Sequence, residues 1–111
     1  MLDRDVVKGF IEPVILAVLA RSDSYGYEIA KYVNEVTDGA LELKEGTLYP
    51  ALRRLEAEKF VQGYWGNETG GPRRRYYRIT NAGIGALDSA RSDWRKNQRV
   101  IGLFLGEAPT L

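Results

Sequence analysis

The sequence contains no cysteine and no histidine, which excludes several kinds of site from the start. Disulfide bonds, zinc sites made of Cys and His, and catalysis by either residue cannot occur in this chain. The absence of cysteine is consistent with a reducing compartment. The sequence also lacks a P-loop and a GxGxxG motif, and its carboxylates show no convincing pairing. We therefore expect no enzymatic activity, no cofactor and no bound metal.

Long hydrophobic runs are also missing. The apolar stretch GFIEPVILAVLA contains Glu12 and Pro13 and is too short to span a bilayer. Charged residues at positions 3–5 precede it, so no signal peptide is visible. The sequence therefore predicts a cytoplasmic protein with no membrane partner.

Neither sign of charge dominates overall, but positive charge is concentrated in one segment. The 111 residues carry a formal net charge of only +1. Residues 44–78 contain eight basic and four acidic side chains, whereas the rest of the chain contains eight basic and eleven acidic ones. Within that segment, TGGPRRRYYRIT at 69–80 places three consecutive arginines after a turn-forming Gly-Gly-Pro. Such a basic patch favours a polyanionic partner.

The spacing of apolar residues predicts three helices in the first half of the chain, over residues 5–21, 24–37 and about 45–59. The first is apolar over so much of its circumference that it should be buried on two sides, and in so small a chain a partner subunit can cover the second side. Pro13 can kink it.

The second and third helices each have one apolar face. The second shows Tyr25, Ile29, Tyr32 and Val36 at helical spacing, residues 22–24 offer capping oxygens, and Gly39 ends it in a left-handed conformation. The third has an apolar face made of Leu48, Leu52 and Leu55, and we expect this face to lie in the core. Pro50 belongs near the first turn of that helix.

A β-hairpin and a long final helix complete the chain. Residues 60–66 and 74–80 are rich in strand-forming types, and the turn-rich NETGGP lies between them. A helix then runs from Thr80 or Asn81 to about Leu105, with an apolar stripe too long for so small a body to cover, so it should need a partner helix.

This order of elements predicts a mainly α fold with a β-hairpin, namely a winged helix-turn-helix over residues 1–80 and a dimerisation helix with its tail over 81–111. The third helix would enter the major groove of DNA, and the arginine-rich hairpin would be the wing. The residues predicted to bind DNA are Tyr25, Thr47, Tyr49, Pro50, Arg53, Arg54, Arg73, Arg74 and Arg75.

Each of these signals also has a purely structural explanation. The arginine run can be a solvated turn, and Arg53 and Arg54 beside Glu56 and Glu58 can be a salt-bridged helix surface. The Tyr76-Tyr77 pair fits strand packing better than base stacking. A winged-helix module that binds another protein instead of DNA is therefore the alternative interpretation.

The strings EGTLYPALRRLEAEKFV, GGPRRRYYRITNAG and DSYGYEIAKYV resemble the PadR family of bacterial transcriptional regulators. The resemblance covers about residues 6–85. It implies a winged-helix homodimer that represses transcription by binding a palindromic operator in double-stranded DNA, with the C-terminal region forming the dimer. The single long C-terminal helix is similar to that of the family's small subfamily.

In some of those small regulators, a central aromatic residue on the last helix lines a pocket for flat aromatic compounds at the dimer interface. Trp94 is at the corresponding place, so the resemblance implies that a planar aromatic effector is a further partner and releases the repressor. Plain interface packing is the other explanation for Trp94. The residues predicted to bind the effector are Phe10, Val14, Trp94 and Ile101. The residues predicted to form the dimer are Ile11, Leu87, Trp94, Ile101 and Leu105.

Overall fold

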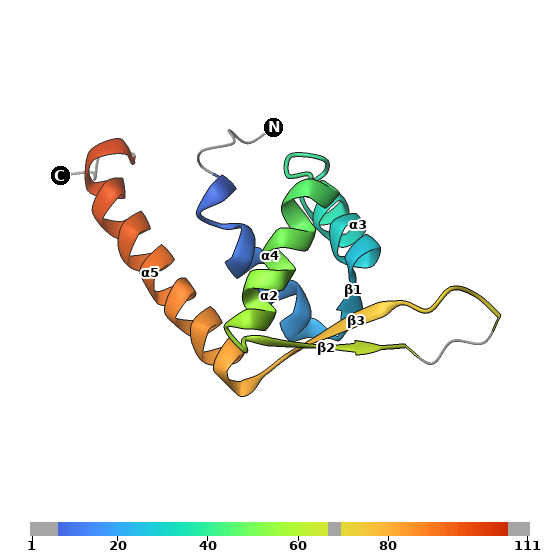
Figure 1. The fold of residues 1–111 in the computed structure, drawn as a ribbon. Coiled ribbons are helices and arrows are strands. Elements are labelled where there is room, and N and C mark those ends of the chain that lie inside the picture. The colour runs from blue at the N-terminus through green and yellow to red at the C-terminus, as the bar shows by residue number, and fades with distance from the viewer. Residues whose placement is uncertain (1–6, 67–69, 107–111) are drawn as a thin grey trace.

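The computed structural model describes residues 7–66 and 70–106 of the chain. Its helices and strands follow one another in the order α2 (Ile11–Arg21), β1 (Ser24–Tyr25), α3 (Gly26–Val36), α4 (Glu45–Ala57), β2 (Val61–Trp65), β3 (Arg75–Ile79) and α5 (Asn81–Leu105) (Figure 1). The expected class is confirmed, because the described residues form a mainly helical winged-helix fold with a long C-terminal helix. No helix among these residues has the length and apolarity to cross a membrane.

The first helix is shorter than predicted, because a break separates α2 from the residues before it. Residues 7–8 are helical, Gly9 and Phe10 form a turn, and α2 then begins at Ile11. Pro13 explains the break, since its ring has no N–H for the carbonyl of Gly9, four residues earlier, and would clash with that carbonyl in a continuous helix. The predicted start at residue 5 lies outside the described residues.

A short strand, β1, replaces the predicted start of the second helix. Ser24 pairs with Tyr77 and Tyr25 with Tyr76, so the sheet has the antiparallel order β1-β3-β2. Ser24 does not cap α3; its hydroxyl donates to the Glu28 carboxylate at 2.6 Å. The expected apolar face is also partly wrong, because Tyr25 belongs to β1 and Val36 is 64% exposed.

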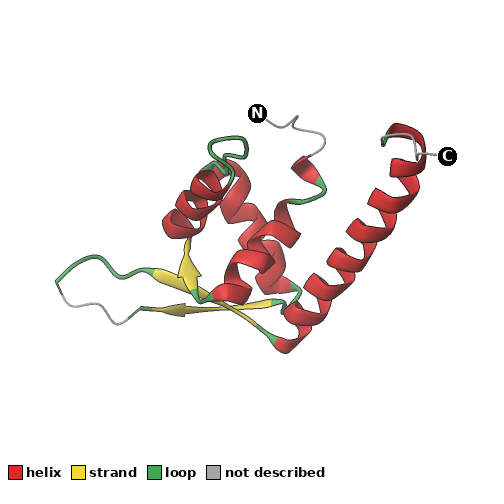
Figure 2. Ribbon diagram, turned by 180° about the vertical axis from the view of Figure 1, so that it is seen from behind, coloured by secondary structure: helices red, strands yellow, loops and turns green. Residues whose placement is uncertain are grey.

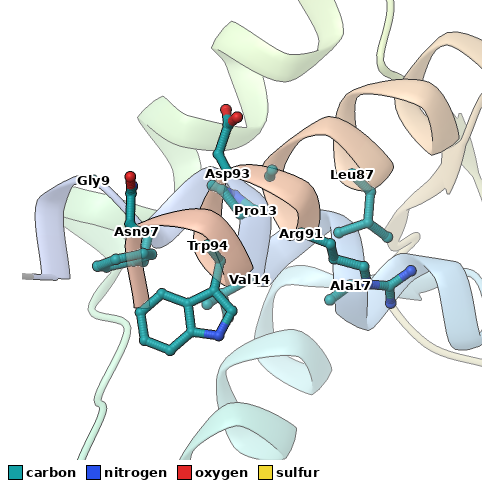
Figure 3. Close-up of a pocket in the computed structure, with 11 residues that line it drawn as sticks. Gly9, Pro13, Val14, Ala17, Leu87, Arg91, Asp93, Trp94 and Asn97 are labelled. Atoms are coloured by element: carbon teal, nitrogen blue, oxygen red, sulfur yellow. The ribbon is translucent and has the colours of Figure 1, made fainter. Parts of the chain in front are cut away.

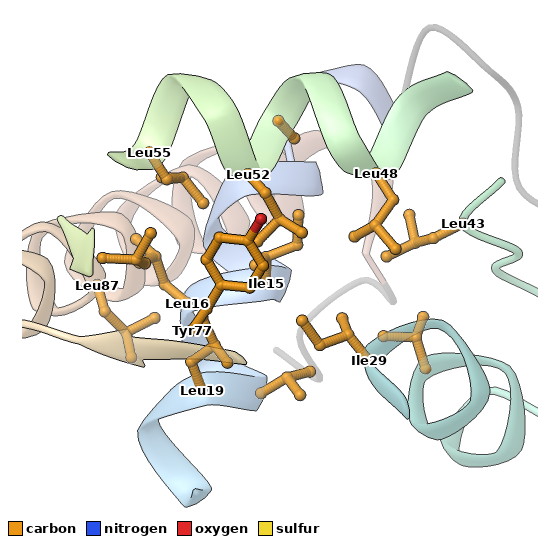
Figure 4. Close-up of a cluster of buried hydrophobic side chains, with 14 of the residues drawn as sticks. Ile15, Leu16, Leu19, Ile29, Leu43, Leu48, Leu52, Leu55, Tyr77 and Leu87 are labelled. Carbon is orange, nitrogen blue, oxygen red and sulfur yellow. The ribbon is translucent and has the colours of Figure 1, made fainter. Parts of the chain in front are cut away.

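The hydrophobic core lies where α2 meets α3, α4 and the inner face of the sheet (Figure 4). The prediction for the third helix is confirmed, since Leu48, Leu52 and Leu55 are all buried. Pro50, however, lies in the second turn of α4 and not in the first. Elements of the same chain surround α2, because α3, α4, α5 and β3 all contact it. The largest fully buried side chains of the core are Ile15, Leu19, Ile29, Leu48, Leu52 and Leu55.

The junction between the hairpin and α5 is tightly built. The Thr80 side chain caps α5 by accepting from the Gly83 backbone N–H at 3.0 Å, which identifies the cap between the two candidates. The Thr80 hydroxyl also donates to the Lys59 carbonyl at 2.7 Å. Gly83 lies so close to Phe60 that a Cβ atom there would be 2.1 Å from the Phe60 carbonyl oxygen.

The hairpin and the end of α5 lie at opposite ends of an elongated molecule (Figures 1 and 2). The principal extents are 64 × 29 × 21 Å. Strand pairing runs from Val61–Ile79 to Trp65–Arg75, so both strands end within about a residue of their predicted bounds. Turn residues 67–69 lie outside the described part. Gly39, as predicted, has a left-handed backbone after α3, with φ of 83°.

Candidate nucleic-acid interface

The outer face of α4 presents polar and basic side chains away from the core. Thr47, Arg53 and Arg54 are exposed, whereas Leu48, Ala51 and Leu52 hold the opposite face against α2. This division follows from the 3.6-residue period of the helix. The described part of the chain offers Arg53 no ion pair, so its guanidinium is available to an external partner.

Arg54 is engaged within the chain. Its Nε donates to the Glu12 carboxylate of α2 at 3.2 Å. The Arg54 side chain remains more than half exposed in this pair. Exposed pairs of this kind are worth about 0–1 kcal/mol, so the contact orients Arg54 without withdrawing it from other partners.

Tyr49 packs the N-terminal part of α4 onto the start of α3. A Cβ atom added at Gly26 would lie 2.5 Å from the Tyr49 hydroxyl oxygen and 2.8 Å from its ring carbons. Only glycine at position 26 allows this close approach. The sequence predicts that Tyr49 contacts DNA; in the chain alone, its ring contacts Gly26 and stays partly exposed.

The three consecutive arginines of the wing have three different environments. The Arg73 guanidinium lies 5.1 Å from the centre of the Trp65 ring, and that of Arg74 lies 4.7 Å from the centre of the Tyr25 ring. Arg75 instead forms a 3.0 Å ion pair with Glu56 of α4. Arg73 and Arg74 are exposed and Arg75 is half-buried. The wing thus offers two accessible cations near its tip, and its third is directed back to α4.

A row of tyrosines covers the outer face of the sheet. Tyr25 meets Tyr76 edge-on at 5.3 Å, and Tyr76 stacks on Tyr64 at 5.7 Å. The Tyr64 hydroxyl donates to Asp23 at 2.5 Å, and this hydrogen bond raises the pKa of Tyr64. Arg78 also donates to Asp23, at 3.3 Å. The row joins β1 to both strands of the hairpin.

The Tyr76-Tyr77 pair is divided between the two faces of the sheet. Tyr77 points into the core, where burial raises the pKa of its hydroxyl. Tyr76 belongs to the outer tyrosine row. The ring contacts of Tyr76 with Tyr25 and Tyr64 are strand packing within this chain.

A pocket of about 530 Å³ lies between α2 and α5 (Figure 3). Phe10, Val14 and Trp94, three of the four predicted effector residues, line it, and the rings of Phe10 and Trp94 meet edge-on at 5.6 Å. Ile101 is not among the lining residues. The charged groups at the pocket are Arg91 and Asp93.

The residues predicted to form the dimer differ in their surroundings. Leu87 is buried in the core of the single chain, and Ile11 packs against that core, so both have contacts without a partner. Trp94 and Ile101 are about half exposed, and Leu105 is 82% exposed. Of the residues predicted to form the dimer, those left uncovered therefore lie on the second half of α5.

Sequence reasoning missed the acidic residues that form ion pairs with Arg54, Arg75 and Arg78. Glu12 and Asp23 lie on or next to α2, and Glu56 lies on α4. Spacing gives no sign of these pairs, because their basic partners lie 19 to 55 residues further along the chain. Gly63, an isolated glycine within a strand, was the one available signal, since such a residue often marks a close approach.

A helix-turn-helix followed by a protruding hairpin, which pairs with the earlier strand β1 in a three-stranded sheet, defines a winged-helix protein. A family pattern for PadR-like transcriptional regulators matches residues 15–89. The chain therefore belongs to the PadR-like family of transcriptional regulators. This is a family of regulators, not one of enzymes.

Two solved structures of transcriptional regulators agree with this assignment. A transcriptional regulator from Clostridium thermocellum is 42% identical with a TM-score of 0.85, over 91% of this chain and 98% of that one. A PadR family regulator from Clostridium difficile is 41% identical with a TM-score of 0.76, over 87% and 99%. An uncharacterized protein X from Lysinibacillus sphaericus is 33% identical over 105 residues, which cover 95% of this chain and 96% of that protein.

Proposed function

We propose that this protein is a transcriptional repressor that binds a palindromic operator as a homodimer. The observation that carries the proposal is the exposure of Arg53 on α4 together with Arg73 and Arg74 on the wing, in a chain of this family. A B-DNA major groove about 12 Å wide accepts one helix such as α4. The wing then extends beside it toward an adjacent groove or the backbone.

The exposed side chains divide into two roles. Arg53 and Thr47 on α4 are suited to base edges, because Arg can bond guanine with two hydrogen bonds and Thr can bond any base or a phosphate. Arg73 and Arg74 on the wing are suited to phosphates, where each neutralised charge releases counterions. Tyr25, whose ring centre lies 4.7 Å from the Arg74 guanidinium, and Pro50 of α4 would add van der Waals contacts with the DNA.

Residues 1–80 would form the DNA-binding unit and residues 81–111 the dimerisation helix with its tail. Support comes from the apolar end of α5, where Leu103, Phe104 and Leu105 are 77–82% exposed in the single chain. A second copy is the partner that fits, because most soluble homo-oligomers are two-fold dimers with self-complementary surfaces. Such a dimer could span two operator half-sites about 34 Å apart.

The pocket between α2 and α5 would take a flat aromatic effector. Its aromatic lining by Phe10 and Trp94 and its volume of about 530 Å³ suit a small planar molecule. In a two-fold dimer, the partner could add Ile101, which the single chain leaves outside the pocket. Binding there would change the spacing of the two α4 helices and so weaken operator binding.

One experiment tests the central claim. Selection of bound sequences from random DNA should return a palindrome with half-sites about one helical turn apart, and light scattering should give the mass of a dimer. A monomer that binds no duplex in dilute salt would contradict the proposal.

A winged-helix module that binds another protein is the second candidate. The ion pair of Arg75 with Glu56 favours it, because it engages one of the predicted DNA-binding cations within the chain. Failure of the selection by a well-folded dimer would support this candidate.

A further inference from the structure

The Glu56 carboxylate lies where α4 meets both strands of the wing. Glu56 belongs to the last turn of α4. Its Oε2 atom accepts from the backbone N–H of Gly63 on β2 at 3.2 Å and from the Arg75 guanidinium on β3 at 3.0 Å. Hydrogen bonds to charged groups are stronger than those between neutral groups. The end of α4 is therefore bonded to both strands of the hairpin through a single side chain.

The missing side chain of Gly63 makes this arrangement possible. Arg75 pairs across the hairpin with Trp65, and its side chain reaches back over Gly63 toward α4. A Cβ atom at position 63 would lie 2.6–2.8 Å from the Nη2, Cζ and Nε atoms of Arg75. The guanidinium also lies 5.4 Å from the centre of the Trp65 ring. The path of Arg75 is thus bounded by Gly63 on one side and by Trp65 on another.

We propose that Glu56, Gly63 and Arg75 form a wing brace, which fixes the angle between the wing and α4. Arg75 is then a positioning residue, not a phosphate contact. Within the sheet, the hairpin pairs with the body of the protein only through the two-residue strand β1, so a wing without the brace would sample a wider range of angles. Holding it at the binding angle lowers the entropy lost on docking. The inference rests on the proposed DNA binding.

For a change at Glu56, the wing brace and simple electrostatics predict opposite changes in DNA affinity. Glu56→Gln removes a negative charge beside the basic wing, which by charge alone would strengthen binding to phosphates. If the brace positions the wing, the same change weakens operator binding by about twofold to fivefold, the range expected for a partly exposed charged pair. Glu58→Gln is the matched control, because Glu58 is exposed and forms no ion pair within the described residues. It should leave affinity unchanged or raise it.

A second variant disrupts the brace without changing any charge. Gly63→Ala places a methyl group where the Arg75 guanidinium lies, and the flexible end of Arg75 can swing aside at little cost to the fold. The released arginine would be free to reach a phosphate. If Arg75 were a DNA contact, Gly63→Ala would therefore preserve affinity; the brace predicts a loss similar to that of Glu56→Gln.

The test measures operator affinity by fluorescence anisotropy over a range of salt concentrations, using the palindrome selected by wild type. Weaker binding by both Glu56→Gln and Gly63→Ala, with the wild-type salt slope, would support the brace. Tighter binding by Glu56→Gln, or unchanged binding by Gly63→Ala, would overturn it. Arg75→Ala should also keep the slope, whereas loss of a phosphate contact would reduce it by about 0.9.

Amide exchange separates the brace from the proposed function. The Gly63 N–H, which donates to Glu56, should exchange faster in Glu56→Gln than in wild type, with or without DNA. If wild type bound no DNA, the proposed function would fail, and the exchange rate would still decide whether the brace exists. An unchanged rate at Gly63 would overturn the brace.

Discussion

Two glycines in the first turns of α5 should respond in opposite directions to the same substitution. Gly85 is exposed and has nothing within 4 Å of the place that an added methyl group would occupy, whereas a methyl at Gly83 would lie 2.1 Å from the Phe60 carbonyl oxygen and 2.7 Å from Cγ1 of Ile79. Alanine is favoured over glycine within a helix by about 1 kcal/mol. Gly85→Ala should therefore stabilise the protein by up to about 1 kcal/mol.

At Gly83, the stability gained by placing alanine instead of glycine in the helix is smaller than the cost of the close contact with Phe60. Overpacking costs about 1–3 kcal/mol, and displacing the helix start would also weaken the Thr80 cap, worth about 1 kcal/mol. Gly83→Ala should thus lower the free energy of unfolding by about 1–3 kcal/mol. The two variants should differ by about 1–4 kcal/mol.

Urea unfolding followed by circular dichroism measures this difference directly. Protein concentration must be fixed across the variants, because association with a second copy would add to the apparent stability. Equal slopes with urea would show that the surface exposed on unfolding is unchanged. A Gly83→Ala variant as stable as Gly85→Ala would refute the close packing of α5 against Phe60.

Three further predictions address the proposed function. Arg73→Ala should weaken binding to all DNA sequences and reduce the salt slope by about 0.9, measured by anisotropy; an unchanged slope would remove Arg73 from the DNA contacts. Arg53→Ala should relax base preference, with a cost of about 1–3 kcal/mol at one position, measured by repeating the sequence selection; recovery of the wild-type operator would contradict this role. Ile101→Asp should give monomers with poor operator affinity, measured by light scattering; a dimer persisting at low micromolar concentration would place the interface elsewhere.

Local sequence signals predicted most of the fold. Leucines at helical spacing identified the buried face of α4, and strand-forming residues around a Gly-rich turn identified the hairpin. The bounds of α5 were also predicted, because Thr80 is a strong capping residue and the apolar stripe ends near Leu105. In each case the information lies within a few residues of the element that it describes.

The missed features depend on residues far apart in the chain. The strand β1 has only two residues, too few to show a period, and its partner Tyr77 comes 53 residues after Ser24. The charge of Arg75 alone suggests a DNA contact, whereas its pairing with Glu56 requires the folded hairpin. The DNA, dimer and effector roles of the predicted residues, Arg75 included, remain predictions.

The long C-terminal helix has a mechanical consequence. Its buried residues are Gly83 and Leu87, and residues 91–105 are all exposed in the single chain, so its far end is carried by a short, firmly held base. At 1.5 Å per residue, the stretch from Leu87 to Leu105 is about 27 Å long, so a tilt of about 10° at Leu87 carries Leu105 through about 5 Å. A small change in the tilt of α5 at its base near the hairpin therefore produces a much larger displacement of its C-terminal end.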